Sequence, residues 1–193
     1  MRPFVSRFDI GIPPEEQGRR YLSRHGTPIR KARLYGSRQG QGPAFNDRLG
    51  EDEAAFIAAR DSFYLATVSE TGWPYLQHRG GPKGFVRVLD EHTLVFPDVR
   101  GNKQYISVGN VQGDGRVSML FMDYPNQARL KLLGRAELLA VDTLPVDQRP
   151  VMDERPVERY FRVHVEAIDW NCPQGITPRY TLEEVQALMA LED

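Results

Sequence analysis

The middle of the chain is a succession of short apolar segments separated by turn residues, and this pattern restricts the fold more than any other feature. Residues 62–68 and 73–79 are rich in β-branched and aromatic side chains and flank the turn residues 70–72. Similar segments cover residues 84–89, 92–96, 116–123, 128–141 and 159–170. Because these segments do not alternate regularly with crossover helices, they predict an antiparallel sheet rather than a doubly wound parallel sheet.

Helical patterns flank the strand segments and interrupt them once. Helices are predicted over residues 13–25 and 51–60, and residues 101–110 show helical spacing between two strand segments. Thr181 and Glu184 have the spacing of a capping box, which predicts a C-terminal helix. The predicted fold class is therefore mainly β with flanking helices (α+β), arranged as an antiparallel barrel.

The charge of the chain divides it into two parts. A length of 193 residues suits one domain with a single core. Residues 1–50 hold 10 Lys and Arg against 4 Asp and Glu (+6), and the remainder holds 15 against 22 (−7), which gives the net charge of −1. We expect a basic N-terminal arm with a short helix over residues 1–50 and a barrel domain with a C-terminal loop and helix over 51–193. The small net charge argues against nucleic acid as a partner.

Cysteine and histidine usage bears on metal sites and on the compartment. The chain has one cysteine, Cys172, and its four histidines lack the spacing of metal ligands. We therefore expect no disulfide framework and no metal site, and the single cysteine fits a reducing cytoplasm. Since we find neither an apolar run of membrane-spanning length nor the apolar core of a signal peptide, a cytoplasmic protein without a membrane partner is expected.

The first candidate site lies where a predicted strand turns into a predicted helix. Phe96 and Asp98 precede the turn, and Arg100, Asn102 and Lys103 lie within it. Free backbone N–H groups at the start of a helix favour a phosphate, and the two cations add positive charge. The same residues suit a helix cap with solvated charges, so this segment alone does not decide between the two interpretations.

The second candidate site follows an apolar strand. Gln77 and Arg79 alternate onto one face of that strand, where both can donate hydrogen bonds to one ligand, and His78 points to the opposite face. Gly80 and Gly81 allow the backbone to approach a flat ring closely. Two other interpretations stay open, a salt bridge at the rim for Arg79 and a structural imidazole for His78.

The third candidate site is a loop after the last predicted strand. Trp170 supplies an aromatic face, and Asn171, Gln174 and Arg179 supply hydrogen-bond donors, within a segment ordered by prolines and a glycine. The alternative is that Trp170 closes the end of the barrel and Arg179 caps a neighbouring carbonyl or carboxylate.

Placed in order, these pieces resemble the pyridoxamine 5′-phosphate oxidase-like flavoprotein family, in its subgroup of predicted flavin-nucleotide-binding proteins. The resemblance covers roughly residues 52–179. It rests on residues 63–74 running into 77–81, on 96–98 with 101–103 and Asn110, and on 169–174.

The resemblance implies a six-stranded antiparallel split β-barrel that forms a homodimer, with FMN at the subunit interface. In that arrangement the strand with Gln77 and Arg79 lies along the flavin, Asn102 and Lys103 grip the phosphate, and the loop after Trp170 approaches the ring from the other subunit. Two family features are incomplete. The arginine-rich signature is only partly present around Arg79, and the closing Arg-Leu pair is not evident after Trp170, so the resemblance does not imply pyridoxamine phosphate as the substrate.

We therefore expect an FMN-binding flavoprotein, an oxidoreductase that works with a small-molecule redox partner, without a catalytic side chain or organic substrate assigned. The expected cofactor-binding residues are Gln77, His78, Arg79, Gly80, Phe96, Asp98, Arg100, Asn102, Lys103, Trp170, Asn171, Gln174 and Arg179. Two alternatives remain: a module that binds or senses flavin, heme or deazaflavin without turnover, and an interaction domain with an empty groove.

Overall fold

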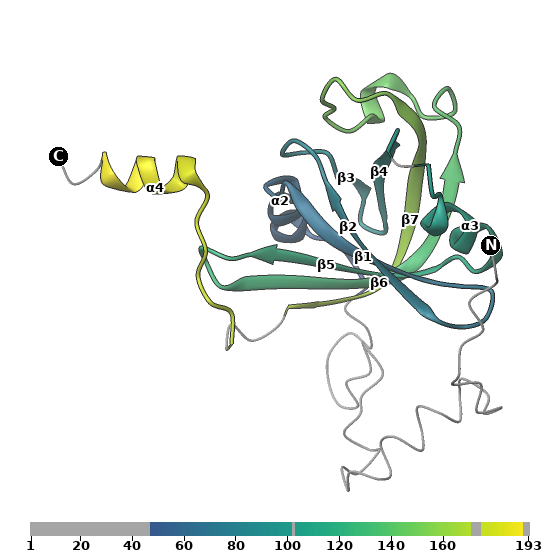
Figure 1. Ribbon diagram of the computed structural model, residues 1–193, viewed down its shortest axis with the longest axis horizontal. Coiled ribbons are helices and arrows are strands. Elements are labelled where there is room, and N and C mark those ends of the chain that lie inside the picture. Colours follow the sequence, from purple (N-terminus) through teal and green to yellow (C-terminus); the bar gives the residue numbers. More distant parts are fainter. Residues whose placement is uncertain (1–46, 102, 171–174, 191–193) are drawn as a thin grey trace, which may run out of the picture.

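The computed structural model describes residues 47–101, 103–170 and 175–190, and within them most of the regular structure is antiparallel strand (Figure 1). The elements are α2 (Glu51–Ala58), β1 (Ser62–Val68), β2 (Pro74–Gly80), β3 (Arg87–Asp90), β4 (Thr93–Val99), α3 (Ile106–Gly113), β5 (Arg116–Asp123), β6 (Ala128–Leu139), a 3₁₀ turn (Val146–Gln148), β7 (Val157–Trp170) and α4 (Leu182–Met189). The predicted mainly β fold with a few helices is confirmed. The helix predicted over residues 13–25 lies outside the described residues.

All strands of the described residues belong to one sheet of seven strands in the order β2-β1-β5-β6-β7-β4-β3. Every neighbouring pair is antiparallel, and the end strands β2 and β3 are not neighbours, so neither the count of six strands nor a closed barrel is confirmed. The segment predicted over 84–89 forms a strand only from Arg87 onward. Gly84 has a φ of 85°, which starts the segment as a turn, and a register shift between Val88 and Asp90 shortens its pairing with β4.

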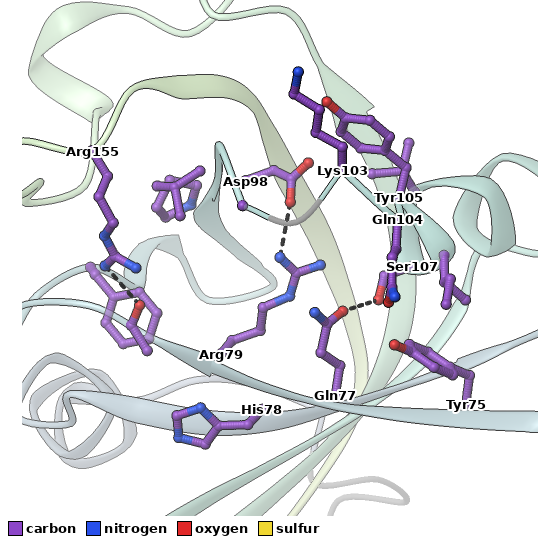
Figure 2. A pocket seen from close by; sticks show the side chains of 17 residues that line it. Tyr75, Gln77, His78, Arg79, Asp98, Lys103, Gln104, Tyr105, Ser107 and Arg155 are labelled. Carbon is purple, nitrogen blue, oxygen red and sulfur yellow. Dashed lines mark hydrogen bonds and ion pairs between the residues drawn. The ribbon is translucent and has the colours of Figure 1, made fainter.

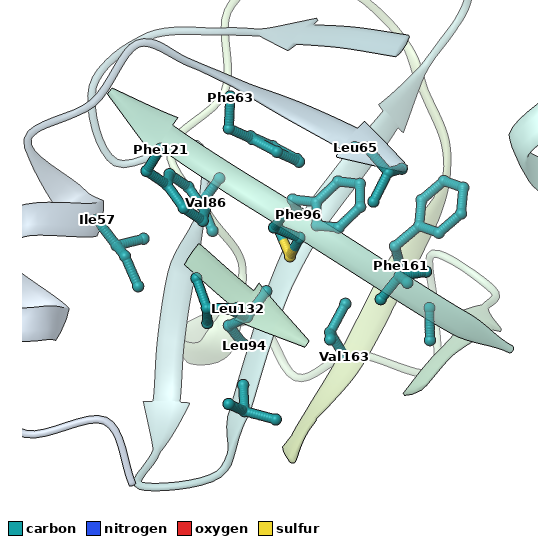
Figure 3. Close-up of a cluster of buried hydrophobic side chains, with 14 of the residues drawn as sticks. Ile57, Phe63, Leu65, Val86, Leu94, Phe96, Phe121, Leu132, Phe161 and Val163 are labelled. Carbon is teal, nitrogen blue, oxygen red and sulfur yellow. The ribbon is translucent and has the colours of Figure 1, made fainter. Parts of the chain in front are cut away.

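The sheet curls so that strands far apart in its order face each other across the core. Phe63 of β1 and Phe96 of β4 pack edge to face with centroids 5.0 Å apart, although β5, β6 and β7 lie between those strands in the sheet. Phe121 of β5 and Phe161 of β7 extend the same cluster, stacking on Phe63 and Phe96 at 5.0 Å and 4.9 Å (Figure 3). The four buried rings therefore form the centre of a strongly curved sheet.

Helix α2 packs on the core and is tied to the end of β7. Ile57 is fully buried among the core residues, and Phe56 meets the indole of Trp170 edge to face at 4.7 Å. The carboxylate of Glu53 accepts from Trp170 Nε1 at 2.6 Å and from the backbone N–H of Gly50 at 2.9 Å. The helix predicted over 51–60 is thus present, and the N–H group that precedes its first turn is satisfied by one of its own side chains.

The C-terminal segment leaves the body beside the β5–β6 turn. Gln127 Nε2 donates to the carbonyl of Ile176 at 2.7 Å, after which α4 projects away from the sheet (Figure 1). The predicted capping box is confirmed, because Thr181 Oγ1 accepts from the N–H of Glu184 and the Glu184 carboxylate accepts from the N–H of Thr181. None of the described helices is long and apolar enough to cross a membrane.

A glycine allows the two longest strands to pair closely. Gly134 lies on β6 at the register shift between β6 and β7, and a Cβ at this position would collide with the carbonyl oxygen of His164. Gly109, in helix α3, differs in this respect. A Cβ on Gly109 would have no heavy atom of the described residues within 4 Å beyond its own helix, so a side chain there meets open space.

These two glycines make a matched stability test. Gly134→Ala should lower the free energy of unfolding by about 1–3 kcal/mol, because the new methyl group forces β6 and β7 apart. Gly109→Ala should raise it by about 0.5–1 kcal/mol, because alanine has the higher helix propensity. Urea titration of both variants measures this; a Gly134→Ala protein as stable as the wild type contradicts the close pairing.

Candidate functional site

A pocket of about 310 Å³ lies between strand β2, the end of β4 and the segment that leads into α3 (Figure 2). Tyr75, Gln77 and Arg79 reach it from the same face of β2, as the alternation of that strand predicts. Asp98 comes from the end of β4 and Lys103 from the turn that follows. Residues from the first two candidate sites of the sequence, Gln77 and Arg79 with Asp98 and Lys103, therefore meet in one cavity.

The ionised side chains of the pocket favour an anion. Arg79, Lys103 and Arg155 line it as cations, and Asp98 is the one carboxylate among the described residues of the lining. Arg155 comes from the connection between β6 and β7 and donates to the carbonyl of Gly80 at 3.0 Å. It also pairs with Asp153, which lies outside the lining. Three cations against one carboxylate suit a doubly negative group such as a phosphate.

Arg79 is held in place by Asp98. Arg79 Nη1 lies 2.9 Å from Asp98 Oδ1, and the second oxygen of Asp98 lies 3.6 Å from Arg159 Nε. The Arg79 guanidinium also lies over the ring of Phe161, 5.3 Å from its centroid. Arg79 Nε is buried and has no hydrogen-bond partner among the residues that the structure describes. A buried donor without an acceptor is costly, and a ligand that brings an acceptor would remove that cost.

Helix α3 is fixed beneath the pocket by two hydrogen bonds between side chains. Ser107 Oγ donates to Gln77 Oε1 at 2.8 Å, which joins the helix to β2. Asn110 Nδ2 donates to Thr67 Oγ1 at 2.9 Å, which joins it to β1. Since Ser107 and Thr67 are buried, both contacts are shielded from water, and the start of the helix cannot shift without losing them.

The turn before α3 has a strained backbone. Lys103 and Tyr105 both have positive φ, 59° and 50°, a region that non-glycine residues seldom adopt. Tyr105 is kept there by its hydroxyl, which donates to Glu158 Oε1 at 3.2 Å, and by Arg159, which lies 5.1 Å from its ring centroid. The hydrogen bond to Glu158 raises the pKa of Tyr105 above its ordinary value. Strain of this kind is characteristic of functional turns.

Several predicted site residues lie elsewhere in the structure. Phe96 is fully buried in the core and does not line the pocket. Arg100 also stays outside the lining, where it pairs with Glu158 at 3.4 Å. Trp170 contacts α2, and Arg179 lies over the ring of Tyr124, 5.0 Å from its centroid. Asn102, Asn171 and Gln174 lie outside the described residues.

His78 and the paired glycines have partly different surroundings from those expected. His78 and Gly80 are among the residues that line the pocket, but the His78 ring points away from Gln77 and Arg79, as the strand alternation predicts, and meets Tyr64 edge to face at 5.6 Å (Figure 2). A Cβ on Gly81 would lie 2.7 Å from the ring of Phe85. The close approach at Gly81 is therefore to the protein's own aromatic ring.

The sequence patterns missed Tyr105, Ser107 and Arg155. Ser107 lies inside the predicted helical spacing, but nothing local marks it as a partner of Gln77, 30 positions away. Arg155 lies in a connection without strand or helix periodicity, and its reach to Gly80 spans 75 positions. The presence of arginines in this connection was the one available sign of a further cation. The sequence does not show which of their side chains reaches the pocket.

The residues present fit a flavin mononucleotide in its general requirements. The cations suit a phosphate, while the Gln77 amide and the buried Nε of Arg79 supply donors for the polar edge of a ring system. The described residues contain no group of three or more His, Cys, Asp or Glu side chains that could hold a metal ion.

Comparison with solved structures finds matches of low sequence identity. A putative pyridoxamine 5′-phosphate oxidase from Lactobacillus delbrueckii is 21% identical and has a TM-score of 0.49, over 64% of this chain and 94% of that chain. A FAD-binding protein from Mesorhizobium loti is 16% identical, with a TM-score of 0.44 over 64% and 93%. An F420 reductase is 19% identical, with a TM-score of 0.44 over 63% and 98%. No curated protein matches the chain significantly.

The sequence comparison with protein families gives a match that covers all of the sheet. The family described as pyridoxamine 5′-phosphate oxidase matches residues 49–170, which is more than half of the chain and runs from before β1 to the end of β7. The chain belongs to the pyridoxamine 5′-phosphate oxidase family.

Proposed function

We propose that this protein binds FMN in the pocket beside β2 and acts as an FMN-dependent oxidoreductase. The observation that carries the proposal is the combination, among the described residues of one cavity, of three cations against one carboxylate with a donor-rich strand face. Membership of the family supports a flavin as the ligand class, and the cation excess favours a flavin that carries a terminal phosphate.

Four of the lining residues have separate parts in this proposal. Lys103, at the turn into α3, faces the phosphate together with the backbone N–H groups of that turn. Gln77 and Arg79 donate to the polar edge of the ring system, and Asp98 keeps Arg79 in place. Bound FMN would supply hydride or single-electron transfer, which needs no side-chain base. Arg79 also places positive charge beside the ring, which favours a reduced, negatively charged state of the cofactor.

Lys103 gives the sharpest test of the phosphate site. Lys103→Met should weaken FMN binding about tenfold, because it removes a charged contact to the phosphate. It should leave the affinity for riboflavin, which has no phosphate, nearly unchanged. Both dissociation constants follow from quenching of flavin fluorescence, with Lys83→Met as the matched control, since Lys83 is exposed and does not line the pocket. Equal losses for FMN and riboflavin would contradict the assignment.

We further propose a cytoplasmic homodimer with the cofactor at the subunit interface. Tyr105 and Ile106 line the pocket yet remain more than one-third exposed, and Trp73 and Leu76 are exposed on or beside β2. Exposed apolar side chains at the pocket and on the outer face of β2 suit contact with a second copy. In this arrangement the partner would complete the cover over the ring system.

Leu76 tests the dimer without touching the pocket, because it lies on the opposite face of β2 from Gln77 and is 66% exposed. Leu76→Glu should convert a dimer to a monomer in sedimentation velocity and lower FMN affinity at the same time. Val146→Glu, at a position 77% exposed on the β6–β7 connection, should do neither. A monomeric wild type at micromolar concentration overturns a shared site.

The rate of flavin reduction distinguishes an oxidoreductase from a protein that only stores or senses the flavin. When the FMN-loaded protein is mixed with NADH or NADPH in a stopped-flow instrument, an oxidoreductase that uses either donor should lose its flavin absorbance within seconds. A module that only binds or senses the flavin should stay yellow with both donors. Free FMN at the same concentration serves as the control for the uncatalysed reaction.

A further inference from the structure

The outer face of the sheet, opposite the core, is apolar where β2, β1, β5 and the start of β6 run side by side. The strand pairing places on this outer face the side chains that alternate with the core residues, among them Tyr64, Ala66, Leu76, Leu120, Met122 and Leu133. All six are partly or largely exposed, and Leu76 is 66% exposed. Because the solvated face of an antiparallel sheet is usually polar, an apolar outer face indicates a surface that another element covers.

The charged side chains on this outer face are cations. The same alternation places Arg116 of β5 and Arg129 and Lys131 of β6 on it, and no Asp or Glu of β1, β2, β5 or residues 128–133 points to the same face. Arg116 pairs with Asp114, and Lys131 Nζ lies 4.0 Å from Asp169 Oδ2. The buried Nε of Arg129 has no hydrogen-bond partner within the described ranges. The outer face therefore favours an occupant that brings negative charge.

Helix α4 carries an apolar stripe that its own chain leaves exposed. Leu182, Val185 and Met189 are spaced i, i+3 and i+7, so they lie along one side of the helix. These side chains are 73%, 39% and 65% exposed. Residues 180–193 also contain four Asp and Glu and no Lys, Arg or His. The helix therefore combines an apolar stripe with a negative charge.

The path of the chain into α4 leads away from its own outer face. Ile176 is buried, and its carbonyl accepts from Gln127. Arg179 lies over the ring of Tyr124, 5.0 Å from its centroid. Beyond these contacts with the body, α4 begins at Leu182 and projects from the sheet (Figure 1). In this position the stripe of α4 is available to a second copy of the chain.

From these features we propose that α4 of one copy packs its apolar stripe on the outer face of a second copy, which returns the same contact by two-fold symmetry. The dimensions agree: the eight-residue helix is about 12 Å long, and four strands side by side are about 14 Å wide. Residues 1–50, with a charge of +6, suit a cationic face less well than α4 does. The inference rests on the proposed homodimer and names the surfaces that form it.

The contact also supports the wall of the pocket. β2 is an end strand of the sheet, with β1 as its one neighbour among the strands of the described residues. Leu76 points to the outer face, whereas Gln77 and Arg79 point to the pocket. A partner helix that rests on Leu76 therefore stabilises the strand that carries the proposed flavin donors.

A lysine on either side of α4 tests the stripe. Val185→Lys places a cation within the stripe, against an apolar and cationic surface, so the dissociation constant of the dimer should rise about tenfold or more in sedimentation equilibrium. Ala187→Lys adds the same charge on the opposite side of the helix and should change that constant by less than about twofold. Both positions are exposed, so neither variant should unfold the protein. Equal effects of the two variants, or no effect of Val185→Lys, overturn the proposal.

Crosslinking identifies what covers the outer face. In a Cys172→Ser background, Val185→Cys and Ser118→Cys are made as separate proteins; Ser118 lies between Ala66 and Leu133 on the outer face. The two proteins are mixed, allowed to exchange subunits and treated with a short bismaleimide. A product of two chains is expected from the mixture and from neither protein alone. A product from Ser118→Cys alone would show that two outer faces meet directly, which overturns the proposal.

The double variant Val185→Cys/Ser118→Cys separates a second copy from the same chain. A crosslink within one chain, at the mass of a monomer, would show that α4 folds back on its own sheet and overturns the proposal. A dimer without any crosslink, as expected if residues 1–50 or another partner cover the outer face, overturns it as well.

FMN affinity, measured on the same proteins by fluorescence quenching, keeps this inference distinct from the proposed flavin site. A crosslinked dimer that binds no FMN refutes the flavin site and leaves the contact of α4 intact. A wild type that binds FMN as a monomer overturns the dimer and the contact of α4 together, and leaves the flavin pocket intact.

Discussion

The contact between Phe63 and Phe96 is the one on which the site depends most. These rings come from β1 and β4, which are separated by three strands in the sheet, and their edge-to-face packing holds the sheet in its curled form. β2 pairs with β1, and the pocket segment continues from β4. Curvature of the sheet therefore brings the donor-bearing face of β2 opposite Asp98 and Lys103, and flattening it would separate the two halves of the pocket.

Charge inside the pocket is partly compensated by ion pairs. Asp98 is nearly buried between Arg79 and Arg159 and compensates part of their charge, which lowers the cost of keeping two guanidinium groups close together. Lys103 lines the pocket from a strained turn, and Arg155 reaches it from the β6–β7 connection. The pocket therefore has a donor-rich wall along β2 and separate cations at the turn and at the connection, an arrangement that would suit the proposed ligand.

Local sequence patterns predicted the pocket-lining residues that follow one strand. They did not predict the lining residues whose place depends on contacts between distant parts of the chain. The alternation of β2 placed Gln77 and Arg79 on one face, and the strand-to-helix turn singled out Asp98 and Lys103, which line the same pocket. Phe96, one position before the pocket-lining Pro97, points into the core instead. Ser107 and Arg155 were missed because their partners lie 30 and 75 positions away, beyond any periodic signal.

The sequence by itself determined the strand segments, the inserted helix, the capping box at Thr181 and the family, because each of these follows from side-chain periodicity, short-range hydrogen bonding or recognisable motifs. Only the tertiary structure decided the seven-stranded order, the partners of Arg79 and the contact between Ser107 and Gln77. The physical reason is that sheet curvature and buried polar contacts depend on which distant side chains share the same space, and no local pattern encodes that choice.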